Sequence, residues 1–536
     1  MSRILSRGSS SNQPGDQPPI AGRNLINGNW IEATPSSLES RKPASSATIL
    51  WRGGSDPSHI DAAVAAARAA LPTWSAWPFE QRAKVLRSFK ALAIKHEAAL
   101  TSLIRDEVGK PTWDAKAEAQ LLAAKVDITL DASNPGAPLA RVGGFEVAIA
   151  PTRTGRCWFR PHGVMAVVGP FNFPAHLPNG HIVPALAMGN TIVFKPSDKA
   201  PAVGEFLAAL FHEALAEHGA PPGVLNLVQG GADIASKLVS HDNIDGVLFT
   251  GSWPVGRRIM EANLDRPGRL LALEMGGSNA AVVMDDADLR QAAIECVRSA
   301  FITAGQRCTC TRRLIIHEAV AARLIPAICK AASALIIASP DSDHPVFMGP
   351  LISDAARSSA LSSIHSLARA GGELLVEPRA IDGPSTRQSP GWYMSPGVMR
   401  VERFVPFTHG SAGTHAGSDI EIFAPFLRIS VVPSLEEAIA QVNATSFGLA
   451  ASIFTRSRAH ADRFMQEARA GCVNWNTGTA GASSKLPFGG LGHSGNHRPA
   501  GAFSLDYCAY PVAGMVESGD ASTTPPGMRV DDGPLA

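Results

Sequence analysis

The residues best suited to chemistry in this chain are a cysteine in a glycine-containing segment and a glutamate upstream of it. Cys308 lies in AGQRCT (304–309), and Glu274 lies 34 residues earlier in LEMGG (273–277). A thiolate can attack a carbonyl carbon, and a carboxylate can then activate the water that releases the product. Taken alone, Cys308 would be interpreted as a small buried apolar residue. The pairing with Glu274 favours a covalent catalyst.

The neighbours of Cys308 suggest how its reactivity is set. Arg307 is adjacent and could favour the thiolate form. Cys308 also forms a C-x-C pair with Cys310, but no second Cys/His pair lies nearby in the sequence. Because tetrahedral zinc sites need four ligands, we predict no metal site here.

A segment upstream of Glu274 has the features of a phosphate-binding turn. It follows an apolar strand pattern, opens a helical pattern, and consists of Gly251, Ser252, Trp253, Pro254, Val255 and Gly256. Backbone N–H groups at the start of a helix can bind a pyrophosphate. The segment does not match the G-x-G-x-x-G fingerprint, so a plain strand-to-helix turn explains it equally well.

Two earlier segments also end strand patterns. Lys195 and Asp198 in FKPSD (194–198) could bind ribose hydroxyls, and an acidic residue there favours a free 2′-hydroxyl. The alternative is an ordinary proline-containing turn. Asn172 in PFNFP (170–174) could donate to an oxyanion, or it could simply cap a turn.

The elements that must position these residues alternate between strand and helix patterns. Short β-rich runs at 164–168, 191–194, 224–227 and 246–249 are separated by amphipathic helical segments such as 202–218, and a second block of this kind spans 280–473. This alternation predicts two α/β domains with parallel sheets, joined near 271–277. We also expect hairpins at 24–30 and at 145–164, the second around a Thr-Gly turn, and a long helical stretch at 81–109.

Composition narrows the class of protein. The 536 residues carry a formal net charge of +1, which gives no electrostatic argument for nucleic acid or an anionic membrane surface. No apolar run reaches the length of a membrane span. Seven scattered cysteines favour reduced thiols and a cytoplasmic location. The Ser-, Pro- and Gly-rich residues 1–22 and the polar end of the chain are expected to be disordered.

In their order along the chain, Asn172, Lys195, the 251–256 segment, Glu274 and Cys308 resemble the NAD(P)-dependent aldehyde dehydrogenases. The similarity covers about residues 24–515 and includes EIF (421–423), NWN (474–476) and PFGG (487–490). It implies two doubly wound α/β domains and a β extension for oligomerisation. The implied parts are a disordered leader (1–22), an NAD-binding domain (23–142 and 164–273), a catalytic domain (274–473), an oligomerisation hairpin with a C-terminal segment (143–163 and 474–515), and a disordered tail (516–536).

The resemblance also implies roles. Cys308, Glu274 and Asn172 would be catalytic, and NAD would be held by Lys195, Asp198, the 251–256 segment, Glu421 and Phe423 in a homodimer or homotetramer. Segments such as AAKVD (123–127) and GNHRP (495–499) resemble the members that oxidise N-succinylglutamate 5-semialdehyde in arginine catabolism. The alternatives are another small aldehyde as substrate, or a non-catalytic binding protein on the same scaffold. Candidate residues for binding an anionic substrate are Arg307, Lys125, His181, Lys485 and Arg498.

Overall fold

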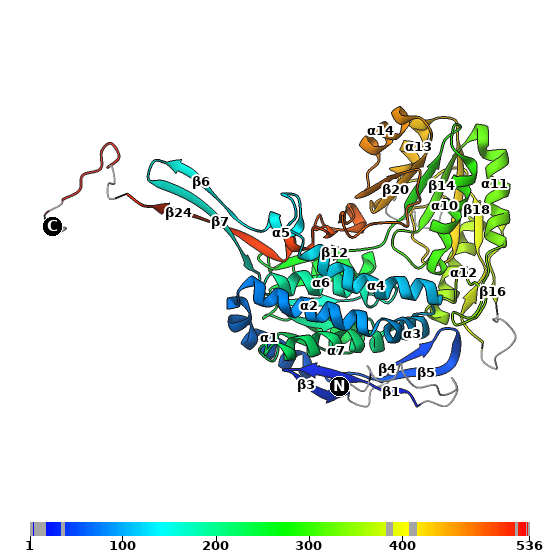
Figure 1. The fold of residues 1–536 in the computed structure, drawn as a ribbon. Helices are drawn as coiled ribbons and strands as arrows, with labels where there is room; N and C mark the ends of the chain where they lie inside the picture. The colour runs from blue at the N-terminus through cyan, green and yellow to red at the C-terminus, as the bar shows by residue number, and fades with distance from the viewer. Residues whose placement is uncertain are drawn as a thin grey trace.

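The protein is built around two seven-stranded sheets, each lying in its own lobe (Figure 1). The computed structural model describes residues 4, 18–33, 38–381, 390–406, 415–519, 524–531 and 533. The predicted α/β class is confirmed. The segment at 275–278 joins β12 (Leu270–Glu274), the last strand of the first sheet along the chain, to β13 (Asn279–Val283), the first strand of the second sheet. This agrees with the predicted junction near 271–277.

The first sheet is parallel except for one strand, β2 (Arg23–Ile26), which runs antiparallel to both of its neighbours. Its spatial order is β12 (Leu270–Glu274), β11 (Gly246–Thr250), β8 (Val164–Val168), β9 (Thr191–Lys195), β10 (Leu225–Leu227), β2 (Arg23–Ile26) and β3 (Asn29–Glu32). The chain runs from β8 to β9 and β10 in one direction, and then returns to β11 and β12 on the other side of β8. The strand order therefore reverses between β8 and β11, which is where open α/β sheets bind ligands.

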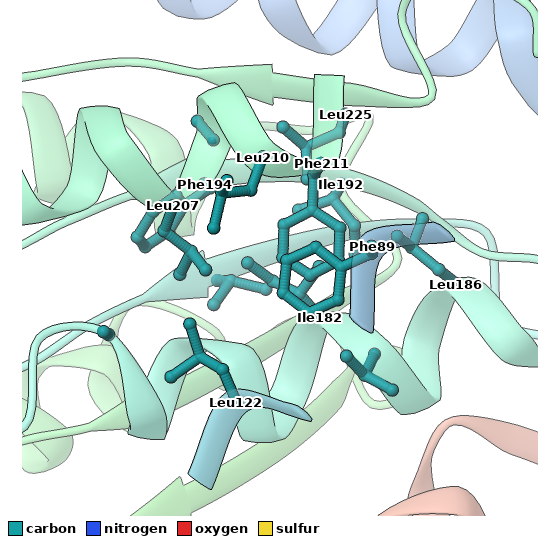
Figure 2. Packing of buried hydrophobic residues seen from close by; sticks show 14 of the residues in the cluster. Phe89, Leu122, Ile182, Leu186, Ile192, Phe194, Leu207, Leu210, Phe211 and Leu225 are labelled. Atoms are coloured by element: carbon teal, nitrogen blue, oxygen red, sulfur yellow. The ribbon is translucent and has the colours of Figure 1, made fainter. Parts of the chain in front are cut away.

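Helices cover both faces of this sheet, because alternate strand residues point to opposite sides. One core lies beneath α2 (Phe79–Lys95), α3 (Glu97–Val108), α4 (Thr112–Thr129), α6 (His176–Ala187) and α7 (Pro201–Glu217), and the other beneath α1 (Ser58–Ala76), α8 (Ala232–Ser240) and α9 (Trp253–Glu261). In the first core Phe89 and Phe211 stack with ring centroids 3.8 Å apart, beside Ile192 and Phe194 of β9 (Figure 2).

The second sheet repeats this plan. Its order is β15 (Glu373–Val376), β18 (Gly397–Arg400), β19 (Phe426–Val432), β14 (Thr311–His317), β13 (Asn279–Val283), β20 (Ala450–Phe454) and β21 (Cys472–Trp475), parallel except for β15. The helices of this lobe are α10 (Leu289–Phe301), α11 (Glu318–Ser333), α12 (Asp354–Arg369), α13 (Leu435–Val442) and α14 (Arg458–Glu467).

A three-stranded arm projects from the body of the molecule (Figure 1). It consists of β6 (Phe145–Ala150), β7 (Arg153–Pro161) and β24 (Ala509–Glu517), and it exposes Phe145, Val147, Ile149 and Met515. The smaller elements are β1 (Ile20–Ala21), β4 (Leu38–Lys42), β5 (Ser45–Gly53), α5 (Pro138–Arg141), β16 (Ala380–Ile381), β17 (Tyr393–Met394), β22 (Pro487–Phe488), β23 (Ala500–Gly501) and α15 (Ser504–Tyr507).

The structure confirms several sequence predictions and corrects others. The hairpin at 24–30 is present as β2 and β3. The helical pattern at 81–109 is two helices, because the chain breaks at His96. In the arm the turn lies at 151–152, while the expected Thr-Gly turn at 154–155 falls inside β7; proline at 151 cannot donate to a ladder. Val164 begins a separate strand.

The chain ends also differ in part from expectation. Ile20 and Ala21 of the expected leader pair with β5, which buries Ile20; residues 1–3 and 5–17 lie outside the described residues. Residues 516 and 517 belong to β24, whereas 520–523, 532 and 534–536 of the expected tail lie outside the described residues. Within the described chain no helix is long and apolar enough to cross a membrane.

Candidate active site

Cys308 and Glu274 line one pocket of about 180 Å³, together with residues of α4, α6 and the 480–484 segment. Cys308 lies in the loop between α10 and β14. Just before it, Thr303 (φ 56°), Ala304 (φ 53°) and Gly305 (φ 71°) all adopt the left-handed conformation, which is costly for the two non-glycine residues. At Gly305 a Cβ atom would lie 2.1 Å from the carbonyl oxygen of Ala424, so only glycine fits.

A buried carboxylate on α4 braces this strained loop. Asp114 accepts hydrogen bonds from the Thr303 hydroxyl at 2.6 Å and from the Arg307 guanidinium at 2.7 Å. Arg307 also donates to the Thr303 hydroxyl at 2.8 Å. The guanidinium is therefore committed to Asp114 and Thr303, and the suggestion that Arg307 favours the Cys308 thiolate is wrong. Burial, followed by the Glu421 and Glu274 carboxyls, raises the pKa of Cys308 to about 12, so the sulfur is a thiol here.

Asn172 lies in the loop after β8 and is tied to the cysteine loop. Its buried side-chain amide donates to the carbonyl oxygen of Gln306 at 2.9 Å. A primary amide has two N–H donors, and this bond uses one of them. The structure thus brings Asn172 to the segment that carries Cys308, although the two residues come from different lobes.

Glu274 is the last residue of β12 and is 5% exposed. Burial raises the pKa of its carboxyl well above the usual range, and the Ala500 N–H opposes that shift. Within the described residues its Oε2 atom has no hydrogen-bond partner. A Cβ atom at Gly489 would lie 2.8 Å from Oε1, so glycine leaves the room that this carboxyl occupies. A buried, under-bonded carboxyl in a pocket is suited to proton transfer.

Sequence reasoning missed the residues that hold the backbone around Glu274. Because β12 is an edge strand, its outer N–H and C=O groups need partners. Asn496 supplies both, accepting from Leu273 N at 3.0 Å and donating to Leu271 O at 2.7 Å. Ser494 accepts from Met275 N at 2.9 Å through its carbonyl and donates to Gly276 O at 2.6 Å through its hydroxyl. In the sequence, Asn496 stood out only as part of the GNHRP segment (495–499), which resembles the family but to which no function was assigned.

The expected cofactor residues of the first lobe lie at the carboxyl ends of its strands. Lys195 ends β9, is buried, and donates to Pro196 O at 2.6 Å; burial lowers its pKa to about 8. Asp198 lies beyond it and pairs with Lys199 at 3.1 Å. The 251–256 segment joins β11 to α9, and a Cβ atom at Gly256 would lie 2.3 Å from the Met275 sulfur. Such close contact resembles the packing role of the last glycine in dinucleotide-binding turns.

The positions of Asn172 and of the 251–256 segment fit the binding of a dinucleotide. Asn172 follows β8 and the 251–256 segment follows β11, so the two lie on either side of the point where the strand order reverses. Within the segment, Trp253 stacks on His493 with centroids 3.9 Å apart, and Val255 is 42% exposed. A buried lysine bonded to a single carbonyl and an open helix start suit ribose hydroxyls and phosphate oxygens.

The remaining expected cofactor residues lie beside the cysteine. Glu421 is half-buried; the loss of solvation raises the pKa of its carboxyl, which accepts from Gly277 N at 3.1 Å. Phe423 meets Phe171 edge to face at 6.0 Å, and the Arg312 guanidinium lies 5.4 Å from its ring. The expected residues therefore form two groups, one at the edge of the first sheet and one around Cys308. Their roles stay predictions.

Three of the five candidate anion-binding residues line the pocket that holds Cys308. These are Lys125, His181 and Arg307. Arg498 lines a different pocket, near Tyr510 and β24, and Lys485 is exposed and lines neither of these two pockets.

Fold and pocket together define an aldehyde dehydrogenase. The family model described as "Aldehyde dehydrogenase family" matches residues 30–511, and the chain belongs to this family. Among curated proteins, the chain is similar to N-succinylglutamate 5-semialdehyde dehydrogenases. The one from Sphingopyxis alaskensis is 42% identical, covering 90% of this chain and 95% of the relative, and the one from Escherichia coli (strain K12) is 39% identical, covering 95% and 98%.

Solved structures show the same fold. Lactaldehyde dehydrogenase from Escherichia coli superposes with a TM-score of 0.83 at 26% identity, covering 94% of this chain and all of the other. The 1-pyrroline-5-carboxylate dehydrogenase from Thermus, solved with bound NAD, gives 0.84 at 27% identity, covering 96% and 95%.

Proposed function

We propose that this enzyme oxidises N-succinylglutamate 5-semialdehyde to N-succinylglutamate with NAD. The observation that carries the reaction type is the presence of Cys308 and Glu274 on the walls of one pocket. The substrate is supported by relatives of that name at about 40% identity over nearly their whole length. As a step of arginine catabolism, the reaction would take place in the cytoplasm.

In the first half of the reaction, the Cys308 thiol gives its proton to solvent water and the sulfur bonds to the aldehyde carbon. The carbonyl oxygen becomes an oxyanion, which the Asn172 amide is placed to bind because its loop is tied to Gln306. NAD, when bound, would supply the acceptor for the hydride that leaves this carbon as the oxyanion collapses to the thioester. The residues proposed to hold NAD are Lys195, Asp198, Glu421, Phe423 and the 251–256 segment.

The second half releases the acid from the Cys308 thioester. Glu274 takes a proton from water, and the resulting hydroxide attacks the thioester carbon. The C–S bond then breaks, and the departing sulfur takes the proton from Glu274 to return the thiol. No described residue hydrogen-bonds the Oε2 atom of Glu274, which leaves this atom available to that water. The raised pKa of this carboxyl makes it a stronger base than a solvated glutamate once it is ionised.

We propose a separate function for each lobe and for the arm. Residues 23–142 and 164–273 would bind NAD, residues 274–473 would supply the nucleophile, and 143–163 with 474–515 would form an oligomer interface. The exposed apolar side chains of the arm support the last assignment, since such a surface normally packs against another chain. A homodimer or homotetramer is proposed on this basis.

The direct test is an NADH absorbance assay on the full chain with a panel of aldehydes and with NAD or NADP. We expect the highest kcat/KM for N-succinylglutamate 5-semialdehyde with NAD. A higher kcat/KM for another small aldehyde would change the proposed substrate but leave the proposed reaction unchanged. Absence of NADH with every aldehyde would instead support a non-catalytic binding protein.

A further inference from the structure

Lys125 is a buried cation in the wall of the active-site pocket. It lies on α4, is 2% exposed, and lines the same pocket as Cys308 and Glu274. Its ammonium donates to the carbonyl oxygen of Gly501 at 2.7 Å and to the hydroxyl of Ser504 at 3.0 Å. Both acceptors are neutral, and a lysine ammonium has three N–H donors.

Among the described residues Lys125 has no anionic partner, and in this it differs from the other cationic side chains near the pocket. Lys110, just before the same helix, pairs with the buried Glu118 at 2.6 Å. Arg307, the other strong base lining the pocket, pairs with Asp114 at 2.7 Å. For Lys125, no ion pair occurs within the part of the chain that the structure describes. Burying a charge without a counter-ion costs folding free energy. That cost is offset when an anionic ligand binds next to the ammonium.

The other titratable groups that line the pocket do not neutralise Lys125. His176 and His181 are held neutral, because burial lowers the pKa of each to about 3. Burial also raises the pKa of Glu274, which favours its uncharged form, and it raises the pKa of Cys508, the thiol beside Lys125, which keeps that group uncharged as well. Burial lowers the pKa of Lys125 itself to about 8, so the ammonium form still predominates near neutrality. The apolar pocket therefore carries one uncompensated positive charge.

We propose that Lys125 is the anion-binding residue of this pocket, and that a carboxylate of the aldehyde substrate completes its hydrogen bonding. The proposal rests on the proposed function, because N-succinylglutamate 5-semialdehyde carries carboxylates at the end remote from its aldehyde. A carboxylate held on α4 would leave the aldehyde end free to reach Cys308. Lys125 would thus select anionic semialdehydes over neutral aldehydes of similar length.

The test compares selectivity in Lys125→Met, Lys125→Arg and the wild type. For each we would measure kcat/KM with N-succinylglutamate 5-semialdehyde and with hexanal, and take the ratio. Loss of a charge-assisted hydrogen bond should lower that ratio about 10- to 100-fold in Lys125→Met, mainly through KM for the anionic substrate. Lys125→Arg should recover part of it. Lys116→Met, which removes an exposed lysine of the same helix outside the pocket, is the matched control and should keep the wild-type ratio.

The outcomes separate this inference from the proposed function. A wild type that does not prefer the anionic aldehyde refutes the proposed substrate. A wild type that does prefer it, with a Lys125→Met variant that keeps the preference, refutes the role of Lys125. If Lys125→Met does not fold, calorimetry of N-succinylglutamate binding to the wild type decides. Affinity should fall at least tenfold from pH 7 to pH 9.5 as the ammonium deprotonates, and an unchanged affinity would refute the inference.

Discussion

The loop that carries Cys308 and the strand end that carries Glu274 face one pocket, but they are held in different ways. Side chains fix the cysteine loop: Asp114 reaches across from the other lobe to bind Thr303 and Arg307. The glutamate is held through the backbone of its strand, because the Asn496 side chain and the carbonyl and hydroxyl of Ser494 bind the peptide groups along the edge of β12.

This difference matches what each group must do. The cysteine loop contains Thr303 and Ala304 in the left-handed conformation, which costs on the order of 1–3 kcal/mol each and requires a strong counter-interaction. A buried carboxylate bonded to a guanidinium and a hydroxyl provides it. Glu274 ends a regular strand, so uncharged hydrogen bonds to the backbone of that strand suffice. Changes in the brace should therefore affect attack on the aldehyde, and changes at the strand edge should affect thioester hydrolysis.

The largest expected effect is that of Cys308→Ala. Without the sulfur no covalent adduct can form, so NADH production should fall to background in both the burst and the steady state. Stopped-flow absorbance at 340 nm measures both phases, and retained NAD binding, followed by fluorescence, shows that the fold is intact. Residual turnover above background would mean that another group attacks the aldehyde.

Glu274→Gln should separate the two halves of the reaction. The amide keeps the shape of the side chain but cannot accept a proton from water, so we expect the steady-state rate to fall about 10²- to 10⁴-fold while the first turnover still gives a burst of NADH. Rapid-quench trapping of the thioester on Cys308 would confirm the stalled intermediate. A normal steady-state rate would remove Glu274 from the hydrolytic step.

The pKa of Cys308 predicts how its reactivity changes with pH in the free enzyme. Since burial and nearby carboxyls raise that pKa to about 12, the thiolate fraction should increase about tenfold for each pH unit between 7 and 9. Alkylation by iodoacetamide, followed by mass spectrometry of the Cys308 peptide, should therefore accelerate about 100-fold over this interval. Glutathione serves as the reference thiol. A rate that levels off below pH 8 would contradict the raised pKa.

Asp114→Asn tests the side-chain brace. The variant loses the charge-assisted bond to Arg307 and leaves that guanidinium without its counter-ion, which should destabilise the protein by about 3–5 kcal/mol and slow the NADH burst about 10-fold or more. Urea unfolding and burst kinetics measure the two effects. Asp127→Asn removes an exposed carboxylate from the same helix and should change stability by less than about 0.5 kcal/mol. Equal effects of both variants would refute the brace.

Sequence patterns were informative where local chemistry decides the structure and less so where distant segments meet. The buried β-rich runs around 164–168 and 246–249 indicated a parallel sheet, and the Gly305 and Cys308 segment indicated a reactive loop. The direction of the Arg307 side chain could not be predicted, because its partner Asp114 lies 193 residues away. Likewise, Asn496 contacts β12 across more than 200 residues, and nothing in its local sequence indicates an edge partner.

The smallest expected effect is that of Asn496→Ala, which tests the side-chain contacts to the edge of β12. The change leaves the Leu273 N–H and the Leu271 C=O without their partner, at a cost of about 1–3 kcal/mol shared between stability and the orientation of Glu274. The burst of NADH should keep its rate while the steady-state rate falls about 3- to 10-fold. Asn496→Asp keeps only the acceptor and should lie between alanine and the wild type. If instead the burst slows as much as turnover, the edge contact would be supporting the whole pocket, and the two modes of holding the reacting groups would not be separable.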